Sequence, residues 1–210
     1  MARPLLADVI RGFYAVLDRD DEALARTLLA SGARVLQVRL KPHGRRVGAA
    51  EILRAARMAR RVCDEHGAAL VVNDRLDVAL LAGADGVHLG QTDLSIAHAR
   101  PVANNLWIGV STHSLGQVQA AIAAGADYLG YGPVFGTTTK LNPDATQGLA
   151  ALRAAVIAAG TTPVVAIGGI TPDHARDVYA TGAAAICAIS AVNAAADVGA
   201  AGRALGRSDS

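Results

Sequence analysis

Short apolar runs alternate with amphipathic segments along almost the whole chain of 210 residues. The apolar runs contain little polar alternation, which is typical of parallel strands that are buried on both faces. The amphipathic segments have helical periodicity, and most of them end at a glycine. Strands are predicted at residues 12–18, 34–41, 69–74, 86–90, 107–112, 128–135, 163–170 and 184–192.

Helices are predicted between these strands and after the last one, at residues 22–30, 49–65, 77–81, 94–100, 115–124, 149–159, 172–181 and 195–205. Thr171 is expected to cap the seventh helix, with Pro172 in its first turn. Similar phrases at 82–86, 124–128 and 181–185 mark the joints between a helix and the next strand. These phrases indicate repeated βα units within one domain.

Eight βα units in strict alternation favour a compact (β/α)8 barrel. We expect a single domain over residues 1–210, with a core from about residue 12 to residue 205 and a short polar tail at 206–210. A doubly wound sheet is the alternative, although eight units is a large number for one such sheet. In a barrel, the active site lies at the carboxyl ends of the strands.

The composition excludes several classes of partner. The net charge is +2 and aromatic residues make up 3% of the chain, so neither a nucleic-acid arm nor a base-stacking surface is expected. No apolar run is long enough to span a membrane, and no secretory signal is visible. Cys63 and Cys187 do not form a CxxC pair, so buried free thiols and a cytoplasmic location are expected. The six histidines lack the spacing of a zinc site.

A polar loop after the sixth strand is the first candidate for chemistry. Gly136, Thr137, Thr138, Thr139 and Lys140 combine a flexible backbone with hydroxyl groups and one ammonium group, which suits an anionic ligand. Only two of the 20 basic residues are lysines, Lys140 and one other. A lysine that persists in so arginine-rich a chain indicates a need for a compact point charge. A solvated turn is the alternative interpretation of this loop.

The end of the second strand carries a second cluster of polar residues. Strand alternation places Gln37, Arg39 and Lys41 on one side, with Val38 and Leu40 on the other. If the polar side faces the barrel interior, Arg39 requires an anionic partner there. The alternative is that this side faces outward, between the helices.

Asp74 and Asp93 follow two neighbouring strands, so their carboxylates are expected to lie close together. Two adjacent carboxylates repel each other unless a cation or a proton lies between them. Mg²⁺ is often bound by one or two carboxylates together with substrate phosphates, so a magnesium site is predicted here. The alternatives are a helix cap for Asp74 and a turn position for Asp93.

The remaining strand ends add further polar groups. Ser111 ends the fifth strand, and His113, just beyond it, is an acid–base candidate or a helix-start hydrogen-bonding group. Gly169 and Ser190 lie at the ends of the seventh and eighth predicted strands, next to the loops where many barrels bind phosphate. The mouth is thus expected to have two anion-binding halves, one suited to a diphosphate with Mg²⁺ and one to a monophosphate.

Five motifs together resemble the thiamine phosphate synthase family over residues 12 to about 192: QVRLK (37–41), NDRLDVALLAGADGVHLGQTD (73–93), GVSTHS (109–114), GPVFGTTTK (132–140) and AIGGI (166–170). The resemblance implies a transferase of thiamine biosynthesis. It would join hydroxymethylpyrimidine diphosphate to hydroxyethylthiazole phosphate, or to the carboxylated form of that thiazole, and release diphosphate by a dissociative route.

The resemblance also implies a role for each matched position. The pyrimidine diphosphate would be bound by Gln37, Val38, Arg39, Leu40, Lys41, Asn73, Ser111 and Lys140. Arg39, Lys140 and Ser111 would be the catalytic residues. Asp74 and Asp93 would bind Mg²⁺. The thiazole phosphate would be bound by Thr137, Thr138, Thr139, Gly169, Ile189 and Ser190.

Three other functions remain open on this barrel. A related thiazole tautomerase would use His113 as its acid–base residue, but it gives no reason for the two aspartates and Arg39 to occur together. A phosphosugar isomerase or epimerase would need a clear base at a strand end. A non-catalytic sensor of a phosphorylated ligand cannot be separated by fold, and turnover would distinguish it. The sequence leaves the oligomeric state open.

Overall fold

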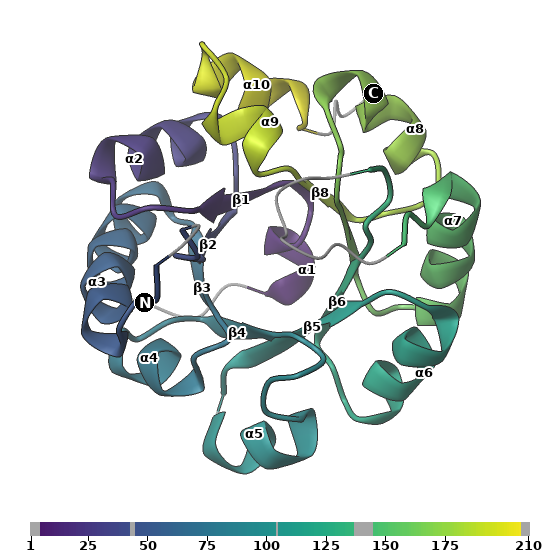
Figure 1. Cartoon of the computed structure of the whole chain (residues 1–210), viewed down its shortest axis with the longest axis horizontal. Coiled ribbons are helices and arrows are strands. Elements are labelled where there is room, and N and C mark those ends of the chain that lie inside the picture. The colour runs from purple at the N-terminus through teal and green to yellow at the C-terminus, as the bar shows by residue number, and fades with distance from the viewer. Residues whose placement is uncertain (1–4, 43–44, 104, 137–144, 207–210) are drawn as a thin grey trace.

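The eight predicted strands form a closed parallel barrel in the order β1 to β8, with β8 paired to β1. The structure is a computed structural model that describes residues 5–42, 45–103, 105–136 and 145–206. Helices surround the ring of strands, as Figure 1 shows. The strands are β1 (Gly12–Leu17), β2 (Val35–Val38), β3 (Ala69–Asn73), β4 (Gly86–Leu89), β5 (Trp107–Thr112), β6 (Tyr128–Tyr131), β7 (Val164–Ile167) and β8 (Ala185–Cys187).

The predicted barrel fold is confirmed, and so is its division into strands and covering helices. Helical segments among the described residues are α1 (Leu6–Val9), α2 (Glu22–Ala30), α3 (Ala49–His66), α4 (Leu76–Leu81), α5 (Ile96–Ala103), α6 (Leu115–Ala123), α7 (Gly148–Ala159), the 3-10 turn η1 (Pro172–His174), α8 (Ala175–Tyr179), α9 (Ser190–Asn193) and α10 (Val198–Ala204).

Several predicted boundaries are wrong. The sixth strand ends at Tyr131 rather than at residue 135, because Pro133 has no N–H group to extend the ladder. The predicted strand 184–192 is only three residues long, and the helix α9 begins at Ser190. The last helix begins at Val198, where the side chain of Asp197 accepts a hydrogen bond from the N–H of Ala200.

Two apolar layers hold the barrel together. The outer layer lies between strands and helices and contains Val38 and Leu40. The inner layer fills the barrel with side chains such as Val16 and Val71, and Val9 of α1 packs against it. The short helix α1, which the sequence analysis did not predict, precedes β1 and therefore closes the barrel at the amino ends of the strands (Figure 1).

The repeated Ala-Gly-Ala-Asp phrases have a structural explanation. Asp85 accepts hydrogen bonds from the N–H of Leu70 at 2.8 Å and from Arg60 at 2.6 Å. Asp127 repeats this arrangement with the N–H of Ile108 at 2.7 Å and with Arg100 at 2.8 Å. Each aspartate joins its own strand to the start of the neighbouring strand, so these residues stabilise the end of the barrel opposite the predicted active site.

Candidate active site

The polar side of β2 faces the barrel interior, as one of the two sequence interpretations required. Gln37 is 6% exposed, and its Nε2 donates to Oδ1 of Asn73 on β3 at 2.8 Å. The hydroxyl of Tyr14, on β1, donates to Oε1 of Gln37 at 2.9 Å. Val38 and Leu40 are buried in the outer layer, so their side chains face away from the interior and only their main chain can face a ligand there. The structure therefore separates the five residues of this motif into two groups.

Arg39 follows β2 at the carboxyl end of the barrel and is half-buried. Burial lowers the pKa of His88 to about 4. Asp74 opposes this shift, and the positive charge of Arg39 adds to it. Arg39 also acts against the rise in the pKa of Cys187 that burial causes. The N–H of Arg39 continues the β2 ladder by donating to the carbonyl of Leu17, so strand alternation puts Arg39 on the same inward side as Gln37. No ion pair or side-chain hydrogen bond of Arg39 is found within the described ranges, so its charge is suited to an anionic ligand.

The two predicted metal-binding aspartates come together at the ends of β3 and β4. Asp74 has a positive φ of 62°, and its Oδ2 lies 2.6 Å from Nζ of Lys41. Asp93 turns back toward β4, where its Oδ2 accepts from the N–H of Gly90 at 2.7 Å. A side chain at residue 90 would put a Cβ atom 2.9 Å from that oxygen, so the Asp93 carboxylate would have to shift to admit it.

Electrostatics confirm that the two carboxylates are neighbours. The pKa of Asp93 is raised, first by burial and also by Asp74, while the N–H of Gly90 opposes the rise. Two carboxylates that disfavour each other's charge match the one or two carboxylates that Mg²⁺ usually takes in proteins. No group of three or more potential side-chain ligands occurs among the residues that the structure covers, so phosphate oxygens or water would have to complete the coordination. The donor set therefore fits Mg²⁺.

Ser111 and His113 have different surroundings. Oγ of Ser111 lies 2.9 Å from Nε2 of His88, inside the barrel. The N–H of His113 donates to Oε1 of Gln117 at 2.6 Å, and its ring contacts the carbonyl of Gly132. Of the two roles left open for His113, the arrangement favours the helix-start hydrogen bond over acid–base chemistry.

The loops after β6 and β7 pack directly against each other. The N–H of Phe135 donates to the carbonyl of Gly168 at 2.9 Å, and a Cβ atom at residue 169 would lie 2.3 Å from the carbonyl oxygen of Gly136. The glycines at 168 and 169 are thus required by this contact between loops, a reason that the sequence analysis did not give. Thr137, Thr138, Thr139 and Lys140 lie outside the described residues.

Ile189 and Ser190 follow β8. Ile189 packs against the inner apolar layer, and the exposed Ser190 begins the short helix α9.

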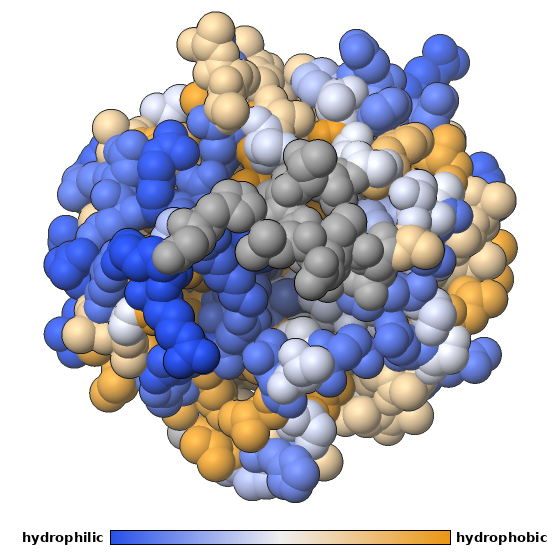
Figure 2. Space-filling view, viewed as in Figure 1, coloured by the Kyte–Doolittle hydropathy of each residue, from blue (hydrophilic) through white to orange (hydrophobic). Residues whose placement is uncertain are grey.

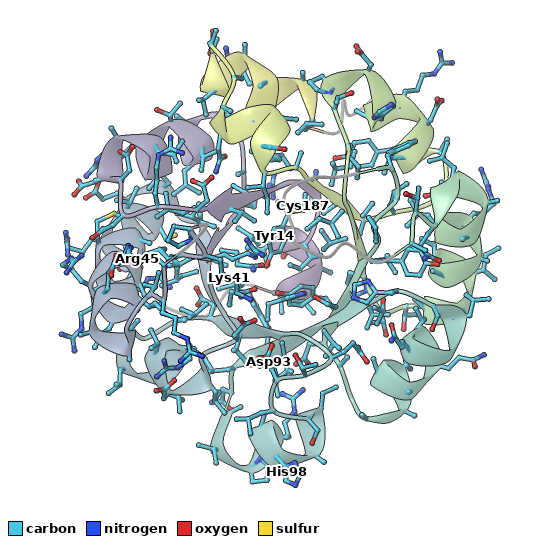
Figure 3. All side chains as sticks on the ribbon, viewed as in Figure 1. Tyr14, Lys41, Arg45, Asp93, His98 and Cys187 are labelled. Atoms are coloured by element: carbon cyan, nitrogen blue, oxygen red, sulfur yellow. The ribbon has the colours of Figure 1, made fainter. Side chains whose placement is uncertain are left out.

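Figure 3 shows Tyr14 and Lys41 within the ring of strands and Asp93 at its border, whereas His98 lies outside on α5. On the face seen in Figure 2, hydrophilic residues gather over the side of the ring formed by α2 and α3. A cavity of about 990 Å³ lies elsewhere, next to the amino ends of β7 and β8, and is lined by Pro163 and Ala184 among others. That cavity is remote from the polar cluster. No helix of the described chain is long and apolar enough to cross a membrane.

Three interior residues were not predicted as site residues from the sequence: Tyr14, His88 and Tyr128. Tyr14 and Tyr128 stand in strands that are otherwise apolar, yet their hydroxyls lie 2.9 Å apart, and Nδ1 of His88 lies 3.1 Å from the hydroxyl of Tyr128. The available signal was a hydrogen-bonding side chain at an inward position of a strand that is otherwise apolar.

The chain is similar to known proteins over most of its length. Residues 13–192 match the family described as thiamine monophosphate synthase. The chain is 45% identical over 187 residues to the thiamine-phosphate synthase of Chloroflexus aurantiacus, covering 89% of this chain and 84% of that protein. It is 46% identical over 189 residues to the thiamine-phosphate synthase of Anaeromyxobacter dehalogenans, covering 89% and 82%.

A solved structure, thiamine phosphate pyrophosphorylase from Pyrococcus furiosus, superposes with a TM-score of 0.86 at 37% identity and covers 96% of each chain. The expected transferase class is confirmed together with the barrel fold. The chain belongs to the thiamine monophosphate synthase family.

Proposed function

We propose that the protein synthesises thiamine monophosphate from hydroxymethylpyrimidine diphosphate and hydroxyethylthiazole phosphate, or its carboxylated form. The observation that carries this proposal is the juxtaposition of Arg39 with the Asp74–Asp93 pair and Lys41 at one end of the barrel. A diphosphate is the ligand whose negative charge can meet both the arginine and a carboxylate-bound Mg²⁺.

The pyrimidine ring would enter the interior beside Gln37, Asn73 and Ser111. The thiazole phosphate would bind beside Gly169, Ile189 and Ser190, with Thr137, Thr138 and Thr139 as further ligands implied by the family resemblance. Lys140 would add positive charge next to the diphosphate on the same ground.

Bond breaking would precede bond making. The pyrimidine methylene carbon loses diphosphate with its bonding electron pair, and the thiazole nitrogen then donates its lone pair to that carbon. Arg39 would bind the departing diphosphate, and the interior side chains would exclude water and orient the ring. When bound to Asp74 and Asp93, Mg²⁺ supplies neutralisation of the leaving group's charge. No strong general base is needed for these steps.

The tautomerase alternative needs a free acid–base residue at His113. Both the backbone N–H and the ring of His113 make hydrogen-bonding contacts within the fold, which weighs against that function. A cytoplasmic setting fits the two buried free thiols, Cys63 and Cys187. A homo-oligomer is compatible with the proposal, and no step depends on it.

Release of diphosphate by the purified protein tests the proposal. Both substrates and Mg²⁺ are supplied together, and each is omitted in turn. Release that requires all three supports the synthase. Release that persists without the thiazole phosphate would indicate a hydrolase, and a folded protein that releases nothing would refute the proposal.

A further inference from the structure

A continuous hydrogen-bonded chain of side chains crosses the barrel interior. Its six members come from six consecutive strands, β1 to β6: Tyr14, Gln37, Asn73, His88, Ser111 and Tyr128. From one end, Asn73 bonds to Gln37 at 2.8 Å, Gln37 to Tyr14 at 2.9 Å, Tyr14 to Tyr128 at 2.9 Å, Tyr128 to His88 at 3.1 Å and His88 to Ser111 at 2.9 Å. Both ends of this chain, Asn73 and Ser111, are residues that the family resemblance places on the pyrimidine substrate.

The middle of the chain is enclosed by the fold. Tyr14 and Tyr128 are 3% and 1% exposed, so water does not compete for their hydroxyls. Two glycines make room for the rings: a Cβ atom at residue 109 would lie 2.1 Å from Cζ of Tyr128, and one at residue 130 would lie 3.2 Å from Cε1 of His88. The backbone is thus shaped to hold this set of side chains.

With the Gln37 amide oriented as in the structure, the number of available protons fixes the direction of each bond. Gln37 donates its amide N–H to Asn73, so its Oε1 must accept the only proton of the Tyr14 hydroxyl. Tyr128 must then donate its own proton to the Tyr14 oxygen, and its oxygen must accept from Nδ1–H of His88. A neutral imidazole with a proton on Nδ1 has a bare Nε2, which accepts the hydroxyl proton of Ser111.

These bond directions determine what Asn73 and Ser111, the two ends of the hydrogen-bonded chain, can offer to a ligand. Ser111 uses its proton inside the chain, so its oxygen can only accept from a ligand. Asn73 accepts from Gln37 at Oδ1, so its Nδ2 can only donate. If both amides were reversed, every bond in the chain would reverse, and the two ends would exchange their roles together.

We propose that Tyr14, Tyr128 and His88 are positioning residues that set the hydrogen-bonding polarity of Ser111 and Asn73, and thereby select the heteroaromatic ring of the substrate. None of the three needs to touch the reacting atoms. The polarity suits a ring that offers an N–H donor to Ser111 and an acceptor to Asn73, as an aminopyrimidine does. The selection of the pyrimidine ring rests on the proposed function, whereas the direction of the hydrogen bonds between the six side chains does not.

The tautomer of His88 in the ligand-free protein tests the polarity directly. Imidazole ¹⁵N chemical shifts separate the Nδ1–H form from the Nε2–H form, and a His88→Gln variant identifies the signal. We expect the Nδ1–H form to exceed the other by about tenfold. In Tyr14→Phe, Tyr128 loses its acceptor and can donate to His88 instead, so the ratio should fall by about fivefold although residue 14 does not contact the imidazole.

Tyr179→Phe is the matched control. It removes the same hydroxyl from a bond to the carbonyl of Leu205, outside the barrel, and should leave the tautomer ratio unchanged. If Tyr14→Phe does not fold, Tyr128→Phe carries the same expectation, because it removes the acceptor of Nδ1–H. A dominant Nε2–H form in the wild type, or an unchanged ratio in the foldable variant, would overturn the proposal.

Kinetics supply the second readout. Tyr14→Phe should raise KM for the pyrimidine diphosphate by about fivefold and leave KM for the thiazole phosphate within about twofold of the wild type. Equal effects on both substrates would contradict selective positioning. A wild-type protein with no turnover would refute the proposed function alone, since the NMR measurement uses no substrate.

Discussion

Gly109 tests the packing of the barrel interior, because the ring of Tyr128 occupies the space where a side chain at this position would lie. A Cβ atom at residue 109 would be 2.1 Å from Cζ, 2.4 Å from Cε1 and 2.5 Å from the hydroxyl oxygen of Tyr128. Ordinary van der Waals contact begins near 3.4 Å. In Gly109→Ala, the ring must therefore retreat by about 1 Å or more within a close-packed interior.

The cost has two parts. Overpacking of a core typically costs about 1–3 kcal/mol. Moving the ring also weakens its buried hydrogen bonds to Tyr14 and His88, each of which contributes about 1 kcal/mol. We expect the free energy of unfolding of Gly109→Ala to fall by about 2–4 kcal/mol, measured by urea denaturation monitored by circular dichroism.

Gly116→Ala is the control for the general effect of replacing glycine. Gly116 lies in α6, where the atom nearest to an added Cβ would be Oγ of Ser114 at 4.0 Å, so alanine should stabilise the protein by about 0.5–1 kcal/mol. If Gly109→Ala were as stable as the wild type, the enclosure of Tyr128 by this strand would be refuted.

Three further outcomes are expected. Asp85→Ala should lower the free energy of unfolding by about 2–3 kcal/mol in a urea titration, because it leaves the largely buried Arg60 and the N–H of Leu70 without the Asp85 acceptor. Asp64→Ala removes a 62% exposed partner of the same arginine and should change that free energy by less than about 0.5 kcal/mol. Burial raises the pKa of Cys63 to about 12, so the neutral thiol favours folding below its ordinary pKa near 9, and this contribution should be lost between about pH 9 and pH 12. The free energies of unfolding of the wild type and Cys63→Ala should therefore converge or cross over that pH range, and parallel curves would contradict the burial. Asp93→Asn should raise the Mg²⁺ concentration for half-maximal diphosphate release by at least about tenfold, equivalent to about 1.4 kcal/mol, and an unchanged Mg²⁺ requirement would exclude Asp93 as a ligand.

The barrel could be predicted from the sequence because its signals are local. Apolar runs, helical periodicity and the recurring glycine stops each specify one element, and the alternation of Gln37 with Val38 correctly separates the interior from the outer layer. The errors occur where a tertiary contact decides the conformation. The inner apolar layer holds α1, and α9 begins where a continued apolar strand was expected.

Part of the site was predictable because local signals in the sequence locate the ends of the strands. Asp74 and Asp93 follow strands, so topology alone brings them together. The chain through Tyr14, Tyr128 and His88 was missed because tyrosines in an apolar strand give no sign of the partner that their hydroxyls will meet across the barrel. Likewise, the sequence suggested a phosphate site at Gly169, and only the structure reveals that the loop after β6 packs against Gly168 and Gly169.

The most direct test of the central claim is the joint measurement of thiamine monophosphate and diphosphate formed from the two substrates with Mg²⁺. The wild type should form both products in equal amounts. Arg39→Gln should lose at least about a hundredfold in rate, while Arg61→Gln, on the exposed surface of α3, should retain the wild-type rate. Equal rates for the two variants, or diphosphate released without thiamine monophosphate, would contradict the account.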